Sequence, residues 1–226
     1  PASTARTAPE ASVTAPAEDD MSHLPRHLSS GVLLFPLIAV TCFSHSAHGH
    51  RPVFTKDAAK GPETAILLTE PQVSQVVYRE ITEKAPQIWL GFSVPKDFEL
   101  YIQIGVPVMD RLKEFRPSIA LVGPGLSRQD APFKIPEGTG LKVFPTTRVK
   151  KPRLFHEHFT GTDSWILRSE TVSLSKPGRY YLVAHSPTEQ TGKLWLSIGK
   201  KESFRKEDWK QFPAWRKLIR TFHGVE

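Results

Sequence analysis

Histidines supply the most chemically suggestive spacing in this 226-residue chain. His156, Glu157 and His158 are consecutive, and residues two apart on a β-strand point to the same face of the sheet. The two imidazoles could share a transition metal, with His185 or Asp163 as a third ligand. Two histidines without a spaced partner are also typical of an exposed strand edge or a capped turn. The triplet therefore leaves a metal site and a structural strand as alternatives.

A second copper hypothesis depends on where the chain is cleaved. Cleavage after Gly49 would expose His50, whose amine and ring could chelate the ion together. Cleavage after Ala47 would instead place a histidine third from the free amine, in His48-Gly49-His50. Nitrogen ligands in either geometry favour Cu(II). One functional hypothesis is thus a periplasmic copper-binding protein that uses the mature N-terminal histidine and the His-Glu-His strand.

Catalytic motifs are missing from the sequence. It contains no nucleophile elbow, no Walker loop and no His-Glu-x-x-His pattern. Acids such as Glu137, Glu157 and Glu170 lie at unrelated spacings, which places no pair of carboxylates for glycoside hydrolysis. We therefore expect a protein that is not an enzyme and needs no cofactor, copper being the one candidate.

Basic residues outnumber acidic ones, 30 to 23, which gives a formal net charge of +7. Such a charge favours anionic surfaces, although it can also serve solubility alone. The expected partners are envelope polysaccharide, an anionic membrane surface or another envelope protein, and export makes nucleic acid an unexpected one. The candidate contact residues are Arg148, Lys150, Lys151, Arg153, Lys210 and Lys217.

Alternating apolar and polar residues predict the strands that must position these side chains. Residues 164–174, 179–185 and 194–198 alternate and are separated by Pro- and Gly-containing turns. Earlier segments with strand character are 65–69, 73–81, 87–94, 98–106, 118–122 and 141–144. Short strands at this spacing, with few helices, predict an all-β protein. We expect an antiparallel β-sandwich of eight or nine strands, jelly-roll or Ig-like.

Part of this strand pattern resembles a known family. Residues 177–184, PGRYYLVA, and 192–199, GKLWLSIG, are similar to the closing hairpin of secreted bacterial β-sandwich modules of the pre-peptidase C-terminal kind. Residues 89–94 and 119–125 take the places of a solvent-facing aromatic strand and of a strand that ends in a Gly-Pro-Gly turn. The resemblance implies an accessory binding or folding unit. The acidic residues that some relatives use for calcium have no counterpart here.

The N-terminal residues have the layout of a secretory signal. Residues 1–20 are rich in Ala, Pro, Thr and Ser, which predicts a disordered or non-native leader. Residues 21–49 contain a mildly basic start, the apolar run 31–43 and a small polar end, as in a signal peptide. A buried helix or a retained anchor is the alternative. The only cysteine, Cys42, lies in the apolar run.

The C-terminal residues change to a helical period. An apolar residue recurs every three to four positions, which predicts one face of an amphipathic helix. These residues are Trp209, Phe212, Trp215, Ile219 and Phe222. Pro213 would open a second helical segment and Gly224 would end it. We favour packing of this face on the sandwich, and a basic helix on a membrane surface is the alternative.

Together these features predict residues 50–199 as the sandwich domain and residues 200–226 as the helical segment. The function that fits them best is an exported, non-enzymatic binding or scaffold module of the cell envelope. The expected location is the periplasm or the extracellular space, with attachment to a surface as an option.

Overall fold

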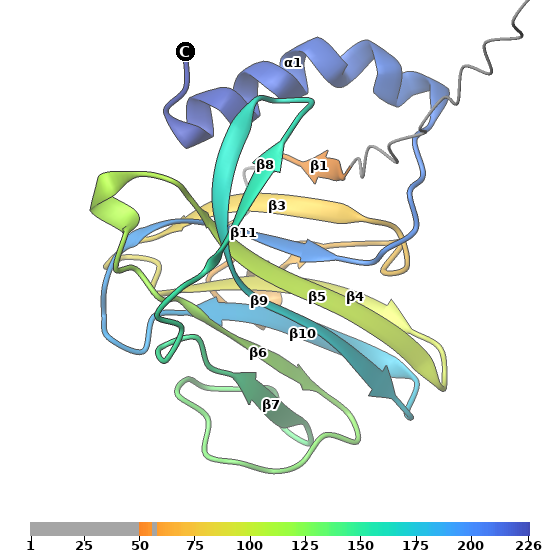
Figure 1. The fold of residues 1–226 in the computed structure, drawn as a ribbon. Helices are drawn as coiled ribbons and strands as arrows, with labels where there is room; N and C mark the ends of the chain where they lie inside the picture. Colours follow the sequence, from red (N-terminus) through yellow and green to blue (C-terminus); the bar gives the residue numbers. More distant parts are fainter. Residues whose placement is uncertain (1–49, 56–57) are drawn as a thin grey trace, which may run out of the picture. The chain divides into compact units, whose positions relative to one another are not determined.

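A computed structural model describes residues 50–55 and 58–226 of the chain. They belong to one compact unit, His45–Glu226, built from two β-sheets and one α-helix (Figure 1). The predicted leader and signal peptide lie outside the described residues.

The larger sheet has six strands in the order β1-β3-β11-β5-β9-β8 (Figure 1). Neighbouring strands are antiparallel, except that β1 pairs with β3 in parallel. The strands are β1 (Arg51–Val53), β3 (Gln75–Ile81), β5 (Phe98–Pro107), β8 (Arg153–Glu157), β9 (Thr162–Leu174) and β11 (Gly192–Ile198).

The smaller sheet has five strands in the order β2-β4-β10-β6-β7, and again one outer pair, β2 with β4, is parallel. Its strands are β2 (Ile66–Leu67), β4 (Gln87–Val94), β6 (Ser118–Gly123), β7 (Gly140–Phe144) and β10 (Gly178–His185). Two short 3-10 helices, Pro62–Thr64 and Asp110–Leu112, lie in the connections.

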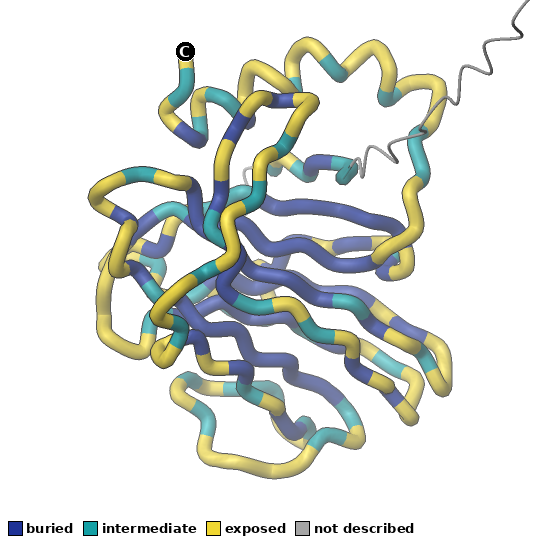
Figure 2. The backbone as a smooth tube through the Cα atoms, in the orientation of Figure 1, coloured by how far each residue is buried: buried dark blue, intermediate teal, exposed yellow. Residues whose placement is uncertain are grey.

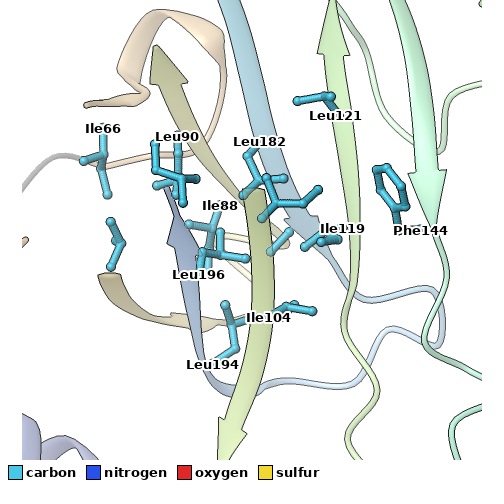
Figure 3. Close-up of a cluster of buried hydrophobic side chains, with 14 of the residues drawn as sticks. Ile66, Ile88, Leu90, Ile104, Ile119, Leu121, Phe144, Leu182, Leu194 and Leu196 are labelled. Carbon is cyan, nitrogen blue, oxygen red and sulfur yellow. The ribbon is translucent and has the colours of Figure 1, made fainter. Parts of the chain in front are cut away.

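The core lies between the two sheets and follows the strand alternation. Figure 2 shows buried segments in the central strands of both sheets, and Figure 3 shows their aliphatic side chains meeting between them. Leu100, Ile102, Ile104 and Val106 of β5 are completely buried, and their two-residue spacing places them on the core-facing side of the strand. Burial on this scale stabilises the fold by roughly 25 cal/mol for each Å² of apolar surface removed from water.

A second apolar cluster lies on the outer side of the smaller sheet. Trp89 of β4 is only 1% exposed and packs edge-on against Phe133 and Tyr181. The residues that cover it come from the long connection between β6 and β7. The expectation of a solvent-facing aromatic strand at residues 89–94 is therefore wrong for Trp89, because that connection folds back over β4.

The β-sandwich prediction is confirmed, with eleven strands among the described residues in place of eight or nine. All nine predicted segments form strands, and the additional ones are β1 and β8. β1 is three residues long and contains Pro52, so it has no alternation to recognise. The strands are not all antiparallel, because β1 and β2 join the edges of the sheets in parallel.

The helix α1 (Lys206–His223) is continuous, so Pro213 does not open a second segment. Asp208 accepts the backbone N–H of Arg205 at 2.7 Å and so caps the first turn. Gly224 ends the helix with φ of 71°, a left-handed conformation that costs glycine little. Within the described residues, no helix combines the length and the apolar character needed to cross a bilayer.

Candidate functional site

The His-Glu-His triplet lies at the tip of the β8–β9 hairpin. His156 donates its Nδ1 hydrogen to Asp163 Oδ1 at 2.7 Å, and its ring lies 5.0 Å from the ring of His158. His158 follows the last residue of β8, and His185 belongs to β10 in the other sheet. No three His, Cys, Asp or Glu side chains gather as metal ligands in the described part of the chain. Copper binding at this hairpin stays a prediction.

His50 lies over the outer face of the larger sheet. Its Nδ1 is hydrogen-bonded to Ser74 Oγ at 2.5 Å. It lines a trough of about 370 Å³ together with Phe155 and Arg153 of β8. His156 is the next residue along the strand from Phe155 and therefore points to the opposite face. The structure therefore separates His50 from His156, a histidine with which it was expected to share a copper ion. Glu157, on the same face as Phe155, does line a small cavity together with His50.

A hydrogen-bonded chain of three side chains joins α1 to the larger sheet. His223 Nδ1 donates to the carbonyl of Ile219 at 2.8 Å, which leaves Nε2 to accept the hydroxyl of Ser164 at 3.1 Å. The Ser164 oxygen in turn accepts the indole N–H of Trp195 at 3.0 Å. Burial lowers the pKa of His223, which favours the neutral ring that this network needs.

A serine hydrogen-bonded to a histidine is one requirement of a catalytic dyad, but this pair is closed to substrates. Both side chains are buried, and the cavity beside them holds only about 20 Å³, room for about one water molecule. The Trp195 indole lies on Gly105, where an added Cβ would overlap it. The pair therefore fastens the helix. Sequence reasoning missed it because Ser164 and His223 are 59 residues apart.

The predicted basic connection is a surface segment between β7 and β8. Arg148, Lys150, Lys151 and Arg153 are all exposed. The connection is held by Arg116, whose Nε donates to the Val149 carbonyl at 2.8 Å. Figure 1 shows β7 and α1 at opposite ends of the described unit, and the basic connection runs from β7 to β8. Arg153 is the first residue of β8, whose hairpin reaches α1, whereas Arg148 lies nearer to β7 in the sequence.

The C-terminal half of α1 is fastened to the sandwich. Ile219 is 5% exposed, and Phe222 packs edge-on against Tyr78 of β3. Arg216 Nε donates to the carbonyl of Phe159 at 3.1 Å, and Arg220 Nη1 donates to that of Thr160 at 3.0 Å. The tip of the β8–β9 hairpin is thereby tied along the side of the helix.

The start of the helix is fixed by a separate contact. Glu70, in the connection before β3, accepts Nη2 of Arg205 at 2.7 Å and Nη2 of Arg51 at 2.9 Å. The hydrogen bond from Arg51 is the main reason that the pKa of Glu70 is lowered. Both ends of α1 are therefore attached to the body of the protein, which sets the position of the residues between them.

Five aromatic rings gather between these two attachments. Phe212 is at their centre, with ring centroids of its neighbours 4.9 to 5.6 Å away. Trp209 is 63% exposed and Phe159 is 45% exposed, so much of the group faces solvent. We call this group the aromatic patch; it consists of Phe159, Phe204, Trp209, Phe212 and Trp215. Phe159 comes from the hairpin and was not predicted.

Three exposed lysines lie on the helix that carries most of the aromatic patch. Lys206, Lys210 and Lys217, here called the lysine rim, are all exposed on α1. Two of them, Lys210 and Lys217, are predicted contact residues. A shallow groove of about 580 Å³ runs between the hairpin and the helix, lined by Phe159, Phe212 and Lys217 among others. Apolar and cationic groups are thus available on one surface.

The packing predicted for the apolar face of the helix is correct at one end and wrong at the other. Ile219 is buried and Phe222 is partly buried against the sandwich, whereas Trp209 is largely exposed. The helix contacts the larger sheet through its last turn, where His223 accepts the hydroxyl of Ser164 of β9 and Phe222 contacts Tyr78 of β3. On the earlier turns Phe212 and Trp215 are partly buried against neighbouring rings, and Trp209 remains exposed.

Comparison with solved structures gives a similarity to a known domain. The chain is similar to the solved pre-peptidase C-terminal domain of a collagenase from Bacillus anthracis. The match covers 61% of this chain and 96% of that domain, with 12% sequence identity and a TM-score of 0.34. That domain is of the pre-peptidase C-terminal kind that residues 177–184 and 192–199 resemble. No protein family and no curated protein matches the chain. Function is therefore inferred from the surfaces of this chain itself.

Proposed function

We propose that this protein is an exported, non-catalytic β-sandwich module that binds a component of the cell envelope. The aromatic patch is the observation that carries the proposal. Single exposed apolar residues are normal on soluble proteins, whereas contiguous groups mark interaction surfaces. Here five rings adjoin one another beside exposed lysines, and both ends of their helix are attached. A surface already held in position loses little conformational entropy when a partner binds.

The side-chain chemistry supports a role without catalysis. The Ser164–His223 pair has the hydrogen bond of a catalytic dyad, but a cavity of about 20 Å³ cannot admit a substrate carbonyl. Its hydrogen bonds attach α1, so the chain uses these groups to position the binding surface. Export is supported by the signal-like layout of residues 21–49.

A pull-down on isolated envelopes tests the proposal. The unit His45–Glu226 has its own hydrophobic core and can be used by itself. We expect it to sediment with envelopes and to lose most of this binding when Trp209 and Phe159 are both changed to Ala. Leu67→Ala is the matched control, because Leu67 is 59% exposed on β2, outside the patch. Equal binding by all variants would contradict the proposal. It would also be contradicted if the protein hydrolysed a substrate from a standard hydrolase panel and the His223→Ala variant did not.

A further inference from the structure

The aromatic patch and the lysine rim together have the chemistry of a membrane-surface element. Interfacial helices combine aromatic residues, which lie among the lipid headgroups, with lysines that meet the phosphates. Trp209 presents a ring that is 63% exposed, next to the exposed Lys206 and Lys210. We propose that this surface binds an anionic lipid bilayer, with Trp209 and Phe159 inserted at the headgroup level. This inference rests on the proposed function and names its partner.

The charge of the helix is complementary to such a surface. α1 contains five basic residues against two acidic ones, a net charge of +3. Both acids lie in the first turn, and Asp208 is engaged in capping the backbone of Arg205. The cations are therefore distributed along the whole length of the helix. Anionic lipids attract such basic helices, and the attraction falls off within a Debye length, about 10 Å at 0.1 M salt.

The type of cation favours lipid over a polysaccharide or a protein. Recognition of a particular sugar acid or carboxylate uses the rigid fork of arginine. On α1, Arg216 and Arg220 already donate to the carbonyls of Phe159 and Thr160. The exposed rim consists of lysines, whose long stems can follow a fluid layer of headgroups. A surface of aromatic rings and lysines therefore suits a lipid bilayer, whose headgroups carry a constant charge but have no fixed positions.

The anchoring of α1 explains how the contact would form. Many interfacial helices fold only when they bind, whereas this one is held by Glu70 at its start and by the sandwich at its end. Phe159 lies 5.3 Å from Phe212, so the hairpin tip extends the apolar surface beyond the helix. The bilayer would therefore contact a surface, made of α1 and the hairpin tip, that is already folded before binding.

Vesicle flotation with the His45–Glu226 unit tests the inference. The probes are phosphatidylcholine vesicles with and without 30 mol% (about one third) phosphatidylglycerol. We expect binding to the anionic vesicles only, weakened about tenfold or more in Lys210→Gln/Lys217→Gln and in Trp209→Ala/Phe159→Ala. The Leu67→Ala variant should bind the anionic vesicles as strongly as the unchanged protein does. Raising the salt to about 0.5 M should weaken the binding further.

A fluorescence measurement identifies the inserted ring. Binding should shift the tryptophan emission to the blue, and Trp209→Phe should keep most of the affinity while reducing that shift. Circular dichroism of each variant confirms that it is folded.

The outcomes separate the two proposals. Retained envelope binding without vesicle binding would overturn the lipid inference and leave the proposed function standing. Binding to soluble envelope polysaccharide in place of vesicles would do the same. Equal binding to neutral and anionic vesicles would also overturn it, because the lysine rim would then have no role. Failure to bind either envelopes or vesicles would overturn both proposals.

Discussion

Truncation of Ile219 to Ala tests how α1 is attached to the sandwich. Its side chain is 5% exposed, at the end of the helix where His223 and Phe222 also contact the sheet. Ile→Ala changes in cores cost about 2–5 kcal/mol, and a helix packed on one side of a domain belongs at the lower end, about 2–3 kcal/mol. In a folded unit of this size each kcal/mol lowers Tm by about 2–4 °C. We therefore expect Tm to fall by about 5–10 °C.

Trp209→Ala provides the matched comparison on the same helical face. The Trp209 side chain is 63% exposed, so its removal should change stability by about 0.5 kcal/mol or less, despite the greater size of the ring. Differential scanning calorimetry of both variants gives the two Tm values. Hydrogen exchange of the amides at residues 214–223 shows whether the Ile219 variant loosens the helix before the sandwich unfolds.

A specific pair of results would refute this account of the helix. If Ile219→Ala leaves both Tm and helix protection unchanged, the C-terminal half of α1 is not packed on β9 in solution. If Trp209→Ala lowers Tm as much as Ile219→Ala does, the aromatic patch is buried and cannot be a binding surface. Either result would also remove the geometric basis of the lipid inference.

Three further predictions concern residues that hold the site in place. Gly105→Ala should destabilise the fold by about 1–3 kcal/mol, measured by urea unfolding, because its Cβ would overlap the packed indole. Burial lowers the pKa of His185 and of His223 below the ordinary 6.5, so the unfolded chain binds more protons below that pH. Tm should therefore be highest above pH 6.5 and should fall as the pH decreases towards the lowered pKa values of the two histidines. The His223→Asn variant should show a smaller fall in Tm. A fall as large as that of the unchanged protein would contradict the role given to His223. Glu70→Gln should speed hydrogen exchange in the first turn after Arg205 while leaving Tm nearly unchanged, and unaltered exchange would argue against that anchor.

Much of the fold follows from local periodicity. The alternation of apolar and polar residues shows which side chains of a strand share a face, and for this reason the core-facing residues of β5 and β10 were predictable. Gly and Pro mark the turns, and Gly224 correctly marks the end of α1. The short β1 was not predicted, and β8 was considered only as a strand around the His-Glu-His triplet, because both form by pairing with longer neighbours and their own sequences carry little signal. Whether a short edge strand pairs in a parallel or an antiparallel direction is likewise not encoded in its own residues.

The sequence by itself indicated that residues 200–226 contain helix with one aromatic face and abundant lysine, although it placed the start of a second segment at Pro213, where the structure has one continuous helix. Only the tertiary structure decided which half of that face is covered, because this depends on where the helix lies over β9. Contacts such as Ser164 with His223 and Glu70 with Arg205 join segments 59 and 135 residues apart. Periodicity describes an element relative to its own axis, whereas packing between distant segments depends on the whole fold. The candidate site arises from that packing, since Phe159 joins the helix only after the hairpin folds beside it.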